Sequence, residues 1–114
     1  MSRPTFHLVP VEVWDAADAT EPYVAASLAS EGFIHCTDGR DALLATAERH
    51  FRDDPRDYLV LTIDLARVGS PWRIDDAAGI YPHVYGPIER SAVVAIATME
   101  RDPVGRFVAI GRDR

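Results

Sequence analysis

The sequence contains no lysine: its 12 basic side chains, histidines aside, are all arginine. A lysine-free chain cannot use a Schiff-base lysine or the lysine of a phosphate-binding P-loop. Its single cysteine, Cys36, has no partner for an internal disulfide or a paired-cysteine zinc motif. No window approaches the roughly 20 apolar residues of a membrane span, and the N-terminus lacks a signal-peptide pattern. We therefore expect a reducing, cytoplasmic location and no membrane partner.

Positive charge is also scarce. The 114 residues carry 12 arginines against 18 aspartates and glutamates, a net charge of −6. This balance argues against an extended nucleic-acid-binding surface, although a few local arginines can serve an RNA end or a nucleotide pocket. The hydrophobic share of 47% is ordinary for a globular protein, so we expect one domain over residues 1–114. Nothing in the sequence selects an oligomeric state.

Hydrophobic periodicity places helices early in the chain and strands late. Helical spacing predicts helices at 10–18, 20–32 and 40–51. Apolar runs and alternation predict strands at 5–9, 33–36, 58–65, 72–75, 92–99 and 104–110. The segment 80–85 is extended but contains Pro82, which predicts an edge strand or a loop lining. This order favours a small α+β fold with flanking N-terminal helices and a mostly antiparallel sheet over a parallel βαβ fold.

Cap residues set the expected helix ends. Thr20 is placed to cap the second helix, and we expect Val24 and Leu28 of that helix to face inward. Gly32 is placed to end it. Asp38 is expected to cap the third helix.

Histidines supply the strongest functional signal. Three of the four lie in short extended segments with bulky apolar neighbours, namely His7, His35 and His83. Because side chains alternate along a strand, His35 should share a face with Phe33 and point away from Ile34 and Cys36. Each histidine alone can be structural, holding a backbone carbonyl, but three in comparable settings favour a shared pocket. His50 lies at a helix end, where an exposed cation suits the helix dipole, and is expected to be solvated.

The segment Y-P-H-V-Y-G-P at 81–87 is the second unusual feature. Two prolines and a glycine restrict its backbone, and Tyr81, His83 and Tyr85 recur at every second residue on one face. Such a ribbon makes a wall for a planar ligand through stacking and hydrogen bonds. The alternative is a packed tyrosine strand that covers the core.

Metal and thiol chemistry are weaker interpretations. Adjacent residues of a strand point to opposite faces, so His35 and Cys36 cannot both ligate one ion from β-structure, and no metal is expected. A zinc-dependent hydrolase remains a third reading, to be tested by metal analysis. Cys36 is expected to be a buried, inert thiol rather than a nucleophile.

Three motifs together resemble a bacterial domain-of-unknown-function family, number 952. They are F-H-L at 6–8, S-L-A-S-E-G-F-I-H-C-T-D at 27–38 and Y-P-H-V-Y-G-P-I at 81–88. The resemblance covers about residues 5–99. It implies an ADP-ribosyltransferase-like fold with a split, mostly antiparallel sheet flanked by helices, and it implies no settled activity.

Within that superfamily the chain is most similar to the RNA 2′-phosphotransferases, which use histidines on the first two of these strands. The resemblance matches His7 to the first-strand residue, His35 to the second-strand histidine, and Thr37 to the small hydroxyl residue after it. The third motif departs from the pattern, because transferases of the superfamily often have glutamate where this chain has Tyr81, His83 and Tyr85. Glu89, after the turn, is the nearest glutamate.

The sequence leads to a hypothesis of a pocket for NAD or a related nucleotide, with group transfer or hydrolysis at the nicotinamide ribose. His7, His35 and His83 are its candidate catalytic residues, with His35 as acid or base. Thr37, Arg40, Tyr81 and Tyr85 are its candidate ligand-binding residues, with Arg40 directed at a pyrophosphate. The alternative is a non-catalytic module on the same fold that binds a small metabolite or a protein.

Overall fold

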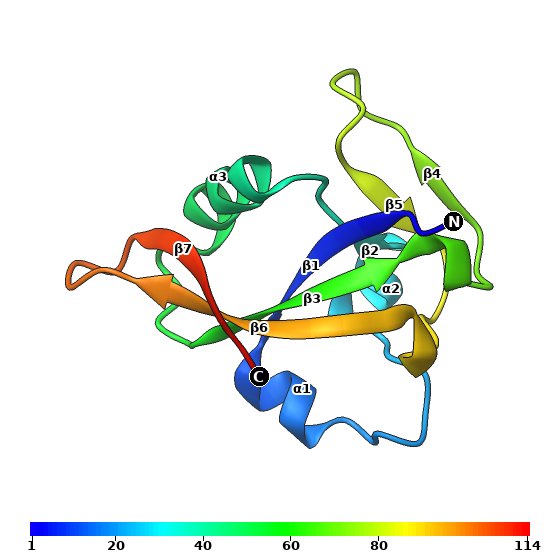
Figure 1. Ribbon diagram of the computed structural model, residues 1–114, viewed down its shortest axis with the longest axis horizontal. Coiled ribbons are helices and arrows are strands. Elements are labelled where there is room, and N and C mark those ends of the chain that lie inside the picture. Colours follow the sequence, from blue (N-terminus) through cyan, green and yellow to red (C-terminus); the bar gives the residue numbers. More distant parts are fainter.

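The computed structural model describes residues 1–114, which form three α-helices and seven β-strands. Their bounds are β1 Pro4–Pro10, α1 Val11–Ala16, α2 Ala26–Glu31, β2 Ile34–His35, α3 Arg40–Phe51, β3 Tyr58–Asp64, β4 Trp72–Ile74, β5 Pro82–Val84, β6 Val93–Arg101 and β7 Phe107–Asp113. The strands form one sheet in the order β1-β3-β6-β7 and a smaller one in the order β2-β5-β4 (Figure 1). Every neighbouring pair is antiparallel, which confirms a small α+β fold with mostly antiparallel sheets. None of the helices combines the length and the apolar character that a membrane crossing needs.

Strand β3 is buried on both faces. Leu61 packs into the main core with Ile34 and Val84 of the smaller sheet. Tyr58, on the opposite face, packs with Ala47 of α3 in a second cluster. Cover on both sides explains why this segment is an almost continuous apolar run.

The two sheets meet where the chain that leaves β2 passes the outer edge of β1. The Phe6 N–H donates to the Thr37 carbonyl (3.0 Å), and the Thr37 N–H donates to the Phe6 carbonyl (2.8 Å). This bridge fixes the end of β2 against β1. It thereby brings His35 next to His7, although the two lie far apart in the sequence.

The second helix begins later than the sequence predicts, and Thr20 is not its cap. Asp18 instead accepts hydrogen bonds from the Thr20 N–H (2.9 Å) and hydroxyl (2.7 Å). Tyr23 then forms a two-bond backbone bridge with Ile88, which holds this part of the chain extended. The prediction that Val24 faces inward is therefore wrong, and its side chain is 53% exposed.

The predicted helix ends have mixed outcomes. Gly32 ends α2 in the left-handed region at φ 88°, which confirms its role, since other residues adopt this region at a cost. Asp38 does not cap α3, which follows Gly39 with no side-chain cap. The Asp38 carboxylate is held elsewhere, by two hydrogen bonds from the Arg3 guanidinium (2.7 and 3.1 Å).

Strand β5 is the central strand of the smaller sheet, so the prediction of an edge strand or loop is wrong. Pro82 fits there because the neighbouring segment bonds to its carbonyl, which accepts the Cys36 N–H (2.9 Å), and a proline retains this carbonyl. The last strand begins at Phe107, later than predicted. Residues before it form a turn in which the Gly105 N–H donates to the Asp102 carbonyl (3.0 Å).

Candidate functional site

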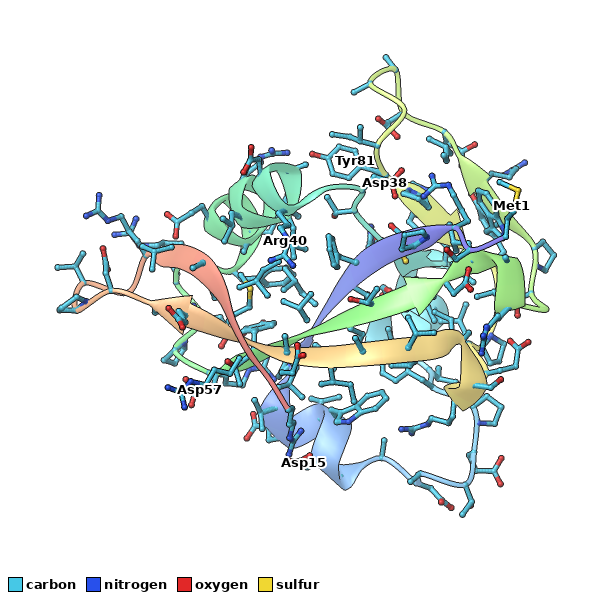
Figure 2. The ribbon with its side chains drawn as sticks, in the orientation of Figure 1. Met1, Asp15, Asp38, Arg40, Asp57 and Tyr81 are labelled. Atoms are coloured by element: carbon cyan, nitrogen blue, oxygen red, sulfur yellow. The ribbon has the colours of Figure 1, made fainter.

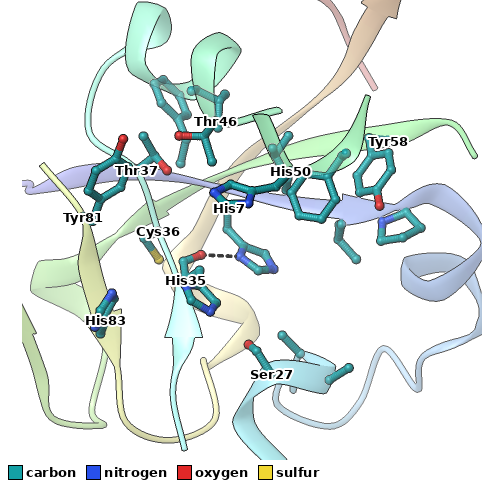
Figure 3. A pocket seen from close by; sticks show the side chains of 18 of the residues that line it. His7, Ser27, His35, Cys36, Thr37, Thr46, His50, Tyr58, Tyr81 and His83 are labelled. Carbon is teal, nitrogen blue, oxygen red and sulfur yellow. Dashed lines mark hydrogen bonds between the residues drawn. The ribbon is translucent and has the colours of Figure 1, made fainter. Parts of the chain in front are cut away.

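A cleft of about 660 Å³ opens between α3 and the smaller sheet, beside β1. Its size lies within the range typical of small-molecule sites. Five of the seven side chains that the sequence predicts for the site line it, namely His7, His35, Thr37, Tyr81 and His83. Figure 3 shows His35 and His83 on neighbouring strands, with Thr46 and His50 projecting from α3 on another side of the cleft.

His7 is buried, and both of its ring nitrogens have partners within the protein. Nδ1 lies 2.6 Å from the His35 carbonyl, which can only accept, so Nδ1 carries the proton (Figure 3). Nε2 is then the acceptor for the Tyr23 hydroxyl, also at 2.6 Å. Burial lowers the pKa of His7 from 6.5 to about 4, so the ring is neutral at pH 7. A direct contact between His7 and a ligand would require one of these two bonds to break.

His35 has a different environment, because its ring is half exposed and forms a hydrogen bond with a carboxylate. Its Nε2 lies 2.9 Å from Oε2 of Glu31, four residues earlier at the end of α2. The carboxylate can only accept, so in the neutral ring Nε2 carries the proton and Nδ1 has a free lone pair. Nδ1 has no hydrogen-bond partner in the protein. His35 is therefore an oriented base with one nitrogen available.

His83 faces His35 directly across the β2–β5 ladder, with 5.6 Å between ring centroids. Its ring stacks on Phe33 at 4.0 Å, and its Nδ1 lies 3.6 Å from a carboxylate oxygen of Asp75. Phe33 also contacts the edge of His35, so the predicted shared face of Phe33 and His35 is confirmed. Both histidines thus belong to one aromatic cluster at the cleft wall.

Tyr81 lies between the β4–β5 hairpin and α3 (Figure 2). The Thr46 and Arg49 side chains of α3, which line the same cleft, lower the pKa of its hydroxyl. The Asp76 carboxylate accepts the backbone N–H groups of Ile80 (3.2 Å) and Tyr81 (2.9 Å), which anchors this part of the hairpin. The backbone of Tyr81 is therefore held at this position, beside α3.

Arg40 and Tyr85 do not line the cleft. Arg40 is exposed in the first turn of α3. The Tyr85 hydroxyl donates to Asp75 (2.7 Å), and Arg73 stacks over its ring at 4.8 Å. Both predicted roles would thus require contacts outside the cleft.

Two other groups that the sequence raises have positions unlike those of the histidines. Cys36 directly follows β2 and lines part of the cleft, but it is buried, as expected, and burial raises the pKa of its thiol to about 12. Glu89 accepts the backbone N–H of Gly69 (2.7 Å) and does not line the cleft.

Tyr23, Glu31 and Arg49 are site residues that the sequence analysis missed. The four-residue interval from Glu31 to His35 across a helix end was a usable signal, because such residues can meet after a tight cap. Tyr23 and Arg49 reach the cleft through tertiary packing, which leaves no local pattern.

Comparisons with known proteins identify a family from the sequence and a similar fold from solved structures. A family described as "Protein of unknown function (DUF952)" matches residues 8–96. The crystal structure of protein CC0527 from Caulobacter crescentus is 25% identical, with a TM-score of 0.76, over 93% of this chain and 94% of that one. A double mutant of CC0527 gives a TM-score of 0.75 at the same identity and coverage. The CC0527 solution structure gives 0.67 at 24% identity, over 90% and 89% of the two chains. No curated protein matches the sequence.

Proposed function

The chain belongs to the DUF952 family, and we propose that its cleft binds a nucleotide of the NAD class and transfers or hydrolyses a group at the ribose. The observation that carries this proposal is the His35–Glu31 pair at the wall of a 660 Å³ cleft. The ADP-ribosyltransferase-like fold and a cytoplasmic setting are part of the same proposal.

The open edge of β1 supports a ligand with an amide or a base edge. In an antiparallel strand, alternate residues direct their N–H and C=O groups to opposite sides. Phe6 uses its groups to bind Thr37, away from β3, so Leu8 directs its own groups to that same side. Leu8 lines the cleft and takes part in no backbone hydrogen bond outside the sheet ladders. A carboxamide or purine edge could use this donor and acceptor together.

His35 is the proposed acid or base. Glu31 holds its Nε2, so Nδ1 can accept the proton of a water or hydroxyl that attacks C1′ of the ribose. The C1′–N bond breaks as the new C–O bond forms, nicotinamide leaves as the neutral base, and His35 then releases the proton to solvent. In this proposal His83 packs beside it and Tyr81 stacks or hydrogen-bonds the ligand. His7 positions the backbone of His35, because its Nδ1–H donates a hydrogen bond to the His35 carbonyl.

A second candidate is a binding module without turnover. The position of Glu89 favours it, because this carboxylate is bound to Gly69 and does not line the cleft. Incubation with NAD separates the candidates: release of nicotinamide indicates turnover, whereas saturable binding without release indicates a sensor.

The direct test is a titration of ¹⁵N-labelled protein with NAD, AMP and ADP-ribose. We expect saturable shifts at Leu8, at residues 34–38 and at Tyr81, with no change in the β6–β7 turn. His35→Ala should weaken NAD binding and abolish any turnover while the far-UV spectrum is unchanged. Arg52→Ala is the control variant, since Arg52 pairs with Glu48 and does not line the cleft. Absence of shifts at millimolar ligand would refute nucleotide binding.

A further inference from the structure

The charged side chains that line the cleft are nearly all engaged within the protein. Glu31 is bonded to His35. Asp76 accepts two backbone N–H groups of its own hairpin. Arg56 pairs with Asp54 at 2.8 Å and with Glu12 at 3.5 Å. The hydrogen-bonding atoms of these groups are therefore largely committed within the protein.

Arg49 is different, because it forms no ion pair although the chain carries a net charge of −6. It lies on the face of α3 that lines the cleft, with Leu43, Thr46 and His50. These positions recur at three- and four-residue intervals, so they share one side of the helix. The guanidinium therefore stands at the cleft wall with no acid to neutralise it.

The other arginines do not share this position. Seven form ion pairs with carboxylates: Arg3, Arg52, Arg56, Arg67, Arg73, Arg106 and Arg114. Arg90 and Arg101 donate to backbone carbonyls. Arg40 and Arg112 form neither kind of contact, but they do not line the cleft. Arg49 is thus the one cleft-lining arginine without an acidic partner.

We propose that Arg49, flanked by His50 and the Tyr81 hydroxyl, is the anion-binding end of the cleft and that the ligand carries a phosphate there. This inference rests on the proposed nucleotide function and specifies how the ligand is oriented. The phosphate lies against α3, and the planar part extends toward β1 and the His35–Glu31 pair.

The chemistry of the three groups fits a phosphate. A guanidinium offers a planar fork of N–H donors that matches two phosphate oxygens. The Tyr81 hydroxyl and an imidazole N–H of His50 can add further donors. Asp76 is the acid of the hairpin that lines the cleft, and its two oxygens accept the backbone N–H groups of Ile80 and Tyr81.

The experiment compares AMP, adenosine and inorganic pyrophosphate by calorimetry on the wild type, Arg49→Gln and Arg52→Gln. The wild type should bind AMP roughly tenfold or more tightly than adenosine, as expected for charge-assisted hydrogen bonds. Arg49→Gln should lose this preference and keep its affinity for adenosine. Arg52→Gln is the matched control, since Arg52 pairs with Glu48 and does not line the cleft.

The outcomes separate the two proposals. Equal binding of AMP and adenosine by the wild type, or an unchanged AMP affinity in Arg49→Gln, would overturn the anion end while leaving the nucleotide cleft. Arg49-dependent binding of pyrophosphate with no nucleotide binding would support the anion end and overturn the nucleotide function. No binding of any probe would overturn both.

Discussion

Replacing Tyr23 by phenylalanine should destabilise the protein, because it removes the hydroxyl that donates a hydrogen bond to the buried His7 imidazole. Tyr23 is 2% exposed, and its hydroxyl is the partner of His7 Nε2 at 2.6 Å. The phenylalanine ring fills nearly the same space. The main consequence is therefore that a buried acceptor nitrogen loses its hydrogen bond.

The magnitude follows from that orphaned nitrogen. An unsatisfied buried polar group costs about 1–3 kcal/mol. In a domain of this size, each kcal/mol lowers Tm by roughly 3–5 °C. We therefore expect Tyr23→Phe to lower the free energy of unfolding by about 1–3 kcal/mol and to reduce Tm by several degrees.

Urea unfolding of Tyr23→Phe, with Tyr85→Phe as the matched control, measures this effect. The Tyr85 hydroxyl also donates a hydrogen bond, in this case to the Asp75 carboxylate, but the bond is exposed, so its loss should cost less than about 0.5 kcal/mol. Equal costs for the two variants would refute the reasoning, because they would show that the buried bond adds nothing beyond an exposed one.

Three further predictions concern the pH dependence of stability, the backbone angle of Gly32 and the reactivity of the Cys36 thiol. The pKa of His7 is about 4 in the folded protein against an ordinary 6.5, so the unfolded chain binds the extra proton first. Stability should thus fall as pH drops from 6.5 to 4, by up to about 1.4 kcal/mol per pH unit from this residue; a His7 ring resonance that titrates near 6.5 in the folded state would contradict this. Gly32→Ala should cost about 1 kcal/mol in thermal unfolding because φ is 88°, whereas Ser30→Ala should be nearly neutral; equal Tm values would be the contrary result. Cys36 should react with a thiol reagent only after denaturation, since its thiol is buried and its pKa is raised to about 12; rapid labelling of the native protein would disprove it.

Sequence reasoning succeeded where the determining interactions are local. The bounds of α3 match the predicted 40–51 because an apolar stripe defines a whole helix. Gly32 was predictable because few residues tolerate its backbone angle. Thr20 failed as a cap because the Tyr23–Ile88 bridge, which joins distant parts of the chain, outweighs a local preference. Pro82 did not indicate an edge strand, because the neighbouring Cys36 N–H needs only the Pro82 carbonyl as its acceptor and no N–H from the proline.

The candidate site shows the same division between local and tertiary information. The alternation of side chains along a strand is enough to predict that His35 points away from the core, unlike its neighbours Ile34 and Cys36. Which side of α3 faces the cleft, however, depends on how the helix packs against the larger sheet. Arg40 and Arg49 are nine residues apart, which corresponds to roughly two and a half helical turns and about 13 Å along the axis. They therefore leave opposite sides of α3 near opposite ends, so a phosphate bound by Arg49 in the cleft cannot also lie against Arg40. Proximity to His35 in the sequence favours Arg40 as the phosphate-binding residue, whereas the packing of α3 favours Arg49. Only the packing determines which side chain reaches the cleft.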